Sequence, residues 1–113
     1  MSVLPALYAN MDCGDWKLRC EAVGDLRELV LAHPDAVTGK RAGKVIDSLV
    51  SRLGDGNSKV NALALEATND ILQAIPNAFK AQLHIMVRRR QVTQITALLR
   101  YLAFNKYLYE TQY

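Results

Sequence analysis

The stretch DWKLRCEAVGDLREL, residues 15–29, carries a helical period that nearly the whole chain follows. Its apolar side chains recur three and four positions apart, as they do on one buried face of an α-helix. These residues are Leu18, Ala22, Leu26 and Leu29. Asp15 stands before the first turn, where a short polar side chain caps free backbone N–H groups. The stretch therefore predicts an amphipathic helix that begins after Asp15.

The same pattern returns 42 residues later in NSKVNALALEATNDI, residues 57–71, with Asn57 or Ser58 as the cap. The shift pairs Leu4 with Ile46, Leu7 with Leu49, Met11 with Leu53, Gly14 with Gly56, Lys17 with Lys59, Leu18 with Val60, Ala22 with Ala64, Val23 with Leu65 and Leu29 with Ile71. Each copy is a helix, a Gly-containing turn and a second helix, which is the size of a HEAT or armadillo unit. Such units bury their one-sided apolar faces by stacking. We therefore expect an all-α fold, a short α-solenoid of two to three HEAT-like helical hairpins.

Clusters of Gly, Pro, Asp and Asn divide the chain into six expected helices. These are 3–11, 16–32, 40–53, 58–75, 78–90 and 93–110. We interpret residues 1–113 as a single domain, with repeat 1 at about 1–34, repeat 2 at about 38–75 and a third helical pair or cap at about 77–110.

The third unit leaves two alternatives, because RRRQVTQ, residues 88–94, contains neither Gly nor Pro. A turn near residues 91–93 would close a third helical pair, whereas one long helix through this segment would favour a swapped dimer. We favour the turn, because Val92, Thr93 and Thr96 are weak helix formers and a long helix would leave its apolar stripe without a partner.

Composition excludes several classes of protein. The 113 residues are half apolar with a net charge of +3, so a partner with an acidic surface is allowed but not required. We find no membrane-spanning apolar run and no secretory signal, and we expect a cytoplasmic protein with no membrane partner. Cys13 and Cys20 fit no zinc motif, and we expect free thiols, with Cys20 in the core, and neither metal nor cofactor.

No motif supports catalysis. GKRAGKV, residues 39–45, resembles a phosphate-binding loop, but its glycines are one residue too close, Val45 replaces the required Ser or Thr, and no strand precedes it. Asp55, Glu66 and Asp70 do not form a convincing acid and base pair. We expect a protein that is not an enzyme and has no small-molecule substrate.

The turns inside stacked helical pairs line up along one edge, where they would display Asp15 to Lys17, then Asn57 to Lys59, then Arg88 to Gln91. On this edge Trp16 is either an exposed anchor for an acidic protein surface or a cover for the end of the first helix. The three arginines Arg88, Arg89 and Arg90 also allow contact with nucleic acid, but most such short runs are solvated helix surface.

Residues 15–29 together with LVSRLGDGNSKVNALALEATNDIL, residues 49–72, resemble the opening HEAT repeats of TOG domains, the tubulin-binding arrays of microtubule regulators. They look most like the TOG domains of the ciliary array regulators of microtubules. In that family a Trp in the pattern W-K-x-R lies in the first intra-repeat turn and contacts tubulin. Trp16, Lys17 and Arg19 match this pattern, and Asn57 and Lys59 correspond loosely to the second turn. The resemblance covers about 75 of the 113 residues, whereas a TOG domain usually has six repeats.

The resemblance implies a tubulin-binding module that regulates microtubule dynamics at the cytoskeleton, in a cilium or at a centrosome. Its implied tubulin-binding residues are Trp16, Lys17, Arg19, Asn57 and Lys59, and the predicted edge adds Arg88, Arg89 and Arg90 as candidates. The alternative is a HEAT-type scaffold that binds a partner other than tubulin, or itself, for example as a homodimer through the C-terminal helix.

Overall fold

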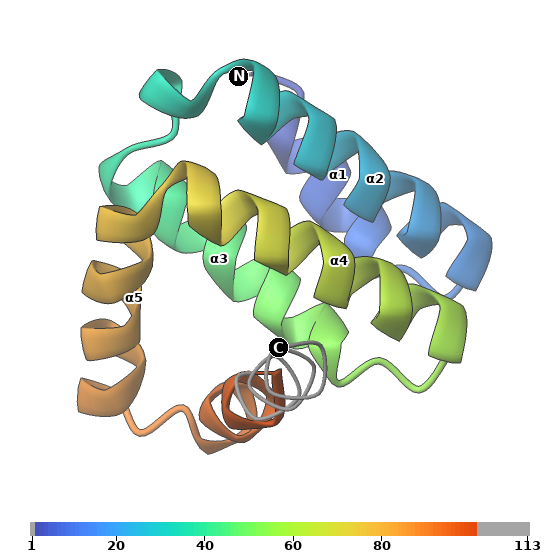
Figure 1. Ribbon diagram of the computed structural model, residues 1–113. Coiled ribbons are helices and arrows are strands. Elements are labelled where there is room, and N and C mark those ends of the chain that lie inside the picture. The colour runs from blue at the N-terminus through green and yellow to red at the C-terminus, as the bar shows by residue number, and fades with distance from the viewer. Residues whose placement is uncertain (1, 102–113) are drawn as a thin grey trace, which may run out of the picture.

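The computed structural model describes residues 2–101, and every regular element in this range is a helix (Figure 1). The all-α class is therefore confirmed. The elements are α1 (Leu4–Met11), α2 (Trp16–Ala32), a short 3-10 helix η1 (Pro34–Ala36), α3 (Gly39–Leu53), α4 (Ser58–Ala74), α5 (Pro76–Arg88) and a last helical segment, 92–101. The part of the predicted final helix from 102 to 110 lies outside the described residues. No helix among residues 2–101 has the length and apolar character needed to cross a bilayer.

Equivalent polar residues cap the N-termini of α2 and α4. The Asp15 carboxylate accepts a hydrogen bond from the backbone N–H of Lys17 at 2.9 Å. The Asn57 side chain accepts from the backbone N–H groups of Lys59 at 2.9 Å and Val60 at 3.3 Å. Each cap satisfies donors that have no partner inside the helix. The structure thus selects Asn57, rather than Ser58, as the cap of α4.

The main layer of the fold is formed by two antiparallel helical pairs, α1–α2 and α3–α4, with α2 and α4 side by side (Figure 1). Val23, Leu26 and Val30 of α2 are fully buried, as are Ala64 and Ile71 of α4. These residues belong to the core that also receives the apolar faces of α1 and α3. The 42-residue shift therefore relates two pairs that pack against each other through their second helices.

The chain turns after α5 and does not continue as one helix. Arg90 adopts a left-handed backbone conformation, with φ of 54°. The backbone N–H of Gln91 donates to Met86 O at 3.0 Å, and that of Arg90 donates to Val87 O at 3.2 Å. This pair of bonds is a Schellman motif, which usually has Gly at the left-handed position. The prediction of a turn is confirmed, although it comes two residues earlier than predicted, and the long-helix alternative is wrong.

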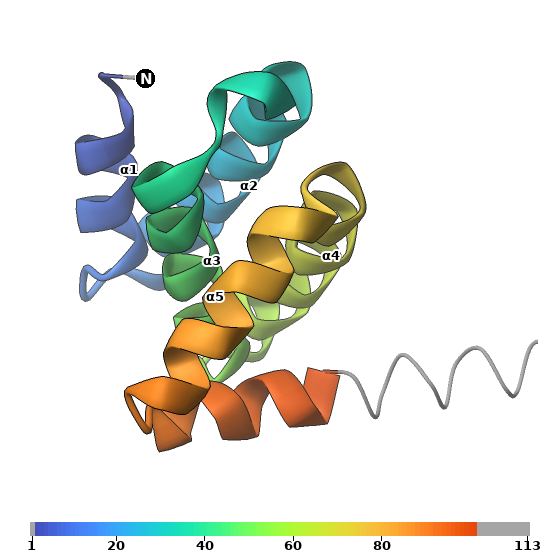
Figure 2. The same ribbon diagram turned by 90° about the vertical axis from the view of Figure 1, so that its left-hand side faces the viewer.

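The third helical pair is set crosswise to the first two. α5 packs mainly on α3, with little contact to α4, and segment 92–101 runs across the end of the second pair (Figure 2). Leu98 and Tyr101 are buried in the common core, and the Tyr101 hydroxyl bonds to Asn69 Oδ1 at 3.2 Å. The third pair, α5 and segment 92–101, thus packs on the second pair, and the α1–α2 pair packs on the other side of the second pair.

Candidate functional site

The turns of the first two pairs are tied together by a network around Asp55. Arg19 donates from Nε to Asp55 Oδ2 at 2.9 Å and from Nη2 to Oδ1 at 3.1 Å. The same guanidinium donates through Nη1 to Cys13 O at 2.8 Å. Arg52 Nη1 donates to Asp55 Oδ2 at 2.9 Å, and the backbone N–H of Asn57 donates to Oδ1 at 2.8 Å. One carboxylate therefore links the α1–α2 turn to the α3–α4 turn.

Asp55 is held in its charged form despite its burial. Only 2% of its side chain is exposed, and that of Arg19 is 15% exposed. Burial by itself raises the pKa of Asp55, but the hydrogen bonds from Arg19 and from Asn57 N–H, with the charges of Arg19 and Arg52, outweigh it and lower the pKa below its ordinary value. The bidentate geometry between Arg19 and the carboxylate also fixes the relative positions of the two turns.

Trp16 is half-buried at this edge, and two lysines contact its ring. The Nζ atom of Lys17 lies 5.8 Å from the ring centroid, and that of Lys59, from the second pair, lies 5.2 Å away. Both distances are within the range of cation–π attraction. The structure thus confirms that Trp16, Lys17 and Lys59 share one edge, and it places the indole where the two helical pairs meet.

The predicted site residues of this edge divide into two groups. Lys17 and Lys59 are exposed beside Trp16, so their ammonium groups are available to a partner. Arg19 and Asn57 are half-buried and are engaged inside the molecule, one with Asp55 and Cys13, the other as the cap of α4. Their positions suit them to hold the edge in shape rather than to contact a partner.

The arginines 88–90 do not continue this edge. In Figure 1 the turn after α5 lies at the lower left, whereas the α1–α2 and α3–α4 turns lie at the right. All three arginines are exposed. The prediction that residues 88–91 continue the edge of the first two turns is therefore wrong. The physical reason is that α5 packs crosswise on α3, which carries the C-terminal end of α5 away from Trp16.

Sequence reasoning missed the central role of Asp55, which it had considered only as a catalytic acid. Asp55 is paired with Arg19 and Arg52, Asp70 is paired with Arg27 at 2.7 Å, and Glu66 is exposed. The DG dipeptide at residues 55–56 marks a turn, and that was the available signal for a carboxylate bonding to nearby backbone N–H groups. The distant partner Arg19 had no such signal.

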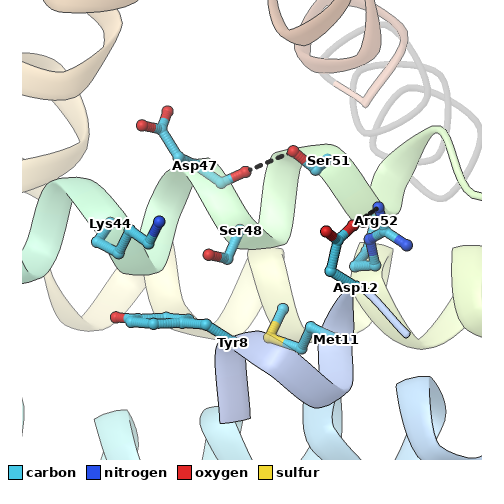
Figure 3. A pocket seen from close by; sticks show the side chains of 8 residues that line it. All are labelled: Tyr8, Met11, Asp12, Lys44, Asp47, Ser48, Ser51 and Arg52. Carbon is cyan, nitrogen blue, oxygen red and sulfur yellow. Dashed lines mark hydrogen bonds and ion pairs between the residues drawn. The ribbon is translucent and has the colours of Figure 1, made fainter. Parts of the chain in front are cut away.

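A polar cleft of about 230 Å³ lies between α1 and α3 (Figure 3). Its charges are balanced, because it is lined by Lys44, Asp47 and Arg52 of α3 and by Asp12 at the end of α1. Arg52 pairs with Asp12 at 3.7 Å, and Lys44 Nζ lies 5.5 Å from the Tyr8 ring centroid. Burial raises the pKa of Tyr8, against an opposing effect of the Arg41 charge. The lining also includes Met11, Ser48 and Ser51, and the Ser51 hydroxyl donates to Asp47 O at 3.0 Å.

The remaining sequence motifs, the segment 39–45 and the two cysteines, do not form a further site among the described residues. Residues 39–45 form the start of α3, not a loop after a strand. Residues 2–101 contain no group of three or more His, Cys, Asp or Glu side chains that could hold a metal ion. Cys13 and Cys20 are free and both half-buried, so the expectation that Cys20 lies in the core is wrong. Comparisons with protein-family models, with curated proteins and with solved structures find no match for this chain.

Proposed function

We propose that this chain is a TOG-like, HEAT-type module that binds tubulin and acts in the regulation of microtubule dynamics. The observation that carries the proposal is the edge where Trp16 lies between Lys17 and Lys59, which come from two different helical pairs. The match of Trp16, Lys17 and Arg19 to the W-K-x-R pattern supports the choice of tubulin over other acidic proteins. A cytoplasmic, cytoskeletal location, in a cilium or at a centrosome, belongs to the same proposal, as does a binding role without catalysis.

The lysines beside Trp16 suit a partner with carboxylates. A cation–π contact at an exposed site is worth only about 0.5–1 kcal/mol. Lys17 and Lys59 can therefore leave the indole for acidic groups of a partner at small cost. The uncovered ring then supplies apolar contact area, and aromatic anchors of this kind dominate binding energy in protein interfaces. The lysines steer the encounter, so binding should weaken as ionic strength rises.

Arg19 and Asn57 act as positioning residues in this proposal. Arg19 holds the α3–α4 turn against the α1–α2 turn through Asp55, and Asn57 fixes the first turn of α4, which carries Lys59. The distance between Lys17 and Lys59 is thereby set by internal hydrogen bonds. Arg88, Arg89 and Arg90 lie at the turn after α5, which Figure 1 shows at the lower left, away from the turns at the right that carry this surface.

The test is co-elution of the purified chain with unpolymerised tubulin on a sizing column, at low and moderate salt. We expect wild type to co-elute at low salt and Trp16→Ala to lose at least about tenfold in affinity, as truncation of an aromatic hot spot does. The variant Lys17→Glu/Lys59→Glu should lose binding as well.

The matched control for the double lysine variant is Lys40→Glu/Lys80→Glu. Both control lysines are exposed, and they lie on α3 and α5, at the far end from Trp16. Each Lys→Glu change removes two charges, so both double variants go from +3 to −1. Equal loss of binding in the two variants would show a net-charge effect and would overturn the proposed edge. Absence of wild-type binding at low salt would overturn the choice of tubulin.

A second candidate is a scaffold for a partner other than tubulin. It is favoured by exposed apolar side chains on other elements than those of the Trp16 edge, among them Val87 on α5 and Leu99 in segment 92–101. A partner held through these residues would remain bound to Trp16→Ala, whereas the tubulin proposal requires the opposite result.

A further inference from the structure

The outer face of the first helical pair is acidic and partly apolar. Arg27 of α2 points to α4, and Asp25 lies two residues earlier, about 200° around the helix and so on the side away from α4. Glu21 and Glu28 share the stripe of Asp25, and Leu18 on the same stripe is exposed. A groove of about 470 Å³ between α1 and α2 is lined by Val3, Leu7, Asp25, Glu28, Leu29, Ala32 and His33.

The opposite end of the molecule is basic and also partly apolar. It is formed by α5, which packs on α3, and by segment 92–101; Figure 2 shows α5 across the front of the second pair and segment 92–101 below it, with α1 at the upper left. Val87, Val92 and Leu99 are 58–69% exposed there. The cations Arg88 and Arg100 are exposed on the same two elements. The uncovered ends of a stack of helical pairs are where further pairs would pack, unless polar capping residues cover them.

The junction between the first two pairs shows how such ends fit together. Buried apolar residues of α2 and α4 form its centre, and two ion pairs cross it, Arg19 with Asp55 and Arg27 with Asp70. In both ion pairs the base comes from the earlier helical pair and the acid from the later one. A junction between two copies would follow the same rule. The basic last pair of one copy would be the earlier partner, and the acidic first pair of the next copy would be the later one.

Among residues 2–101, the charged residues of the two ends form no ion pair. The ion pairs in this range join Arg19, Arg27 and Arg52 to Asp12, Asp55 and Asp70. The acids of the first end and the arginines of the last end remain directed to solvent, next to exposed apolar side chains. A partner for the one end must be basic and apolar, and a partner for the other must be acidic and apolar. A second copy of this chain offers both.

We propose that copies of this chain associate head to tail, with the α5 and 92–101 end of one copy packing on the outer face of α1–α2 of the next. The contact is heterologous, so it leaves both outer ends open and forms chains rather than a closed dimer. Each junction would place an arginine of the earlier copy opposite an acid of the later copy. The inference is independent of the tubulin proposal, since the interface does not include Trp16, Lys17 or Lys59.

The test is the weight-average mass of the full chain against concentration, measured by sedimentation or light scattering at low salt. The mass should rise above 12.6 kDa with concentration, and added salt should reduce it because exposed charges are screened. Asp25→Lys/Glu28→Lys alters one end, and Arg88→Glu/Arg100→Glu alters the other. Each variant alone should associate at least about tenfold more weakly.

Mixing the two variants provides the decisive measurement. The reversed ends are complementary to each other, so an equal mixture should recover the association that each variant lacks. Lys17→Glu/Lys59→Glu has the same change in net charge as the arginine variant and should associate like wild type. Circular dichroism of each variant shows that its helices are retained. A wild-type mass of 12.6 kDa at all concentrations overturns the proposal, as does unchanged association of Asp25→Lys/Glu28→Lys.

Discussion

Replacement of Asp55 by Asn tests the network that joins the two turns. The carboxylate accepts three hydrogen bonds from Arg19 and Arg52 and one from the backbone N–H of Asn57. The amide oxygen of Asn can accept two bonds, and its NH₂ group would face guanidinium N–H groups, which are also donors. At least two charge-assisted bonds are therefore lost.

The expected cost of Asp55→Asn is about 2–3 kcal/mol in the free energy of unfolding. Two hydrogen bonds to a charged group are worth about 3–6 kcal/mol together, and we discount this because water can reach the guanidinium groups at the edge of the molecule. For a domain of this size, the melting temperature should fall by about 8–12 °C. Thermal or denaturant unfolding followed by circular dichroism measures the loss.

Asp12→Asn is the matched control for the Asp55 variant. Asp12 also pairs with Arg52, but at 3.7 Å and with its side chain 88% exposed. Its replacement should change stability by less than about 0.5 kcal/mol. The cost of Asp55→Asn should also be smaller when Arg19 is already replaced by Met, since contacting residues are not additive. A cost of Asp55→Asn no larger than that of Asp12→Asn would refute the reasoning.

Three further predictions concern acid stability and backbone conformation. The pKa of Asp55 is lowered in the folded state, so the carboxylate stabilises the fold above the unfolded-state pKa of about 4. This contribution to the free energy of unfolding is lost as pH falls through the folded-state pKa. The stability difference between wild type and Asp55→Asn should therefore close in acid unfolding curves. Arg90→Gly should raise the melting temperature by a few degrees, about 1 kcal/mol in stability, because Gly adopts the left-handed conformation without strain, and a lower melting temperature would contradict this. Gly24→Ala, whose new Cβ would meet nothing within 4 Å, should stabilise α2 by about 1 kcal/mol, whereas Gly43→Ala should fall at least about 1 kcal/mol below it in denaturant unfolding, because its Cβ would lie 2.6 Å from Gln82 Oε1.

The helices were predictable because their signals are local. The apolar period, the capping residues Asp15 and Asn57, and Pro76 at the start of α5 are all read within one or two turns of the chain. The turn after α5 was harder to locate, because the left-handed residue is Arg90 rather than Gly. The weak helix formers that follow it, such as Val92, and the apolar stripe that one long helix would leave without a partner indicated that the helix stops.

The candidate site was predictable in part. The equivalence of Lys17 and Lys59 follows from the repeat, which predicted both on the edge that carries Trp16, and the structure shows that both contact its ring. The role of Arg19 was not predictable, because its partner Asp55 lies 36 residues away and any of several acids could have reached it. The expected contribution of residues 88–90 to this edge was wrong, because the direction in which α5 packs on α3 depends on the fit of two distant apolar faces and leaves no local signal in the sequence.

Over residues 2–101, the sequence by itself determined that every regular element is a helix, where the helices begin to within two residues, and that two of the helical pairs are equivalent. These properties depend on periodicity, capping and turn chemistry, which act over a few residues. Only the tertiary structure decided that Asp55 joins the two turns, that Trp16 lies between lysines of both pairs, and that the third pair turns aside. Those outcomes depend on which apolar faces fit together and on which charges then come within hydrogen-bonding distance across 36 residues of chain.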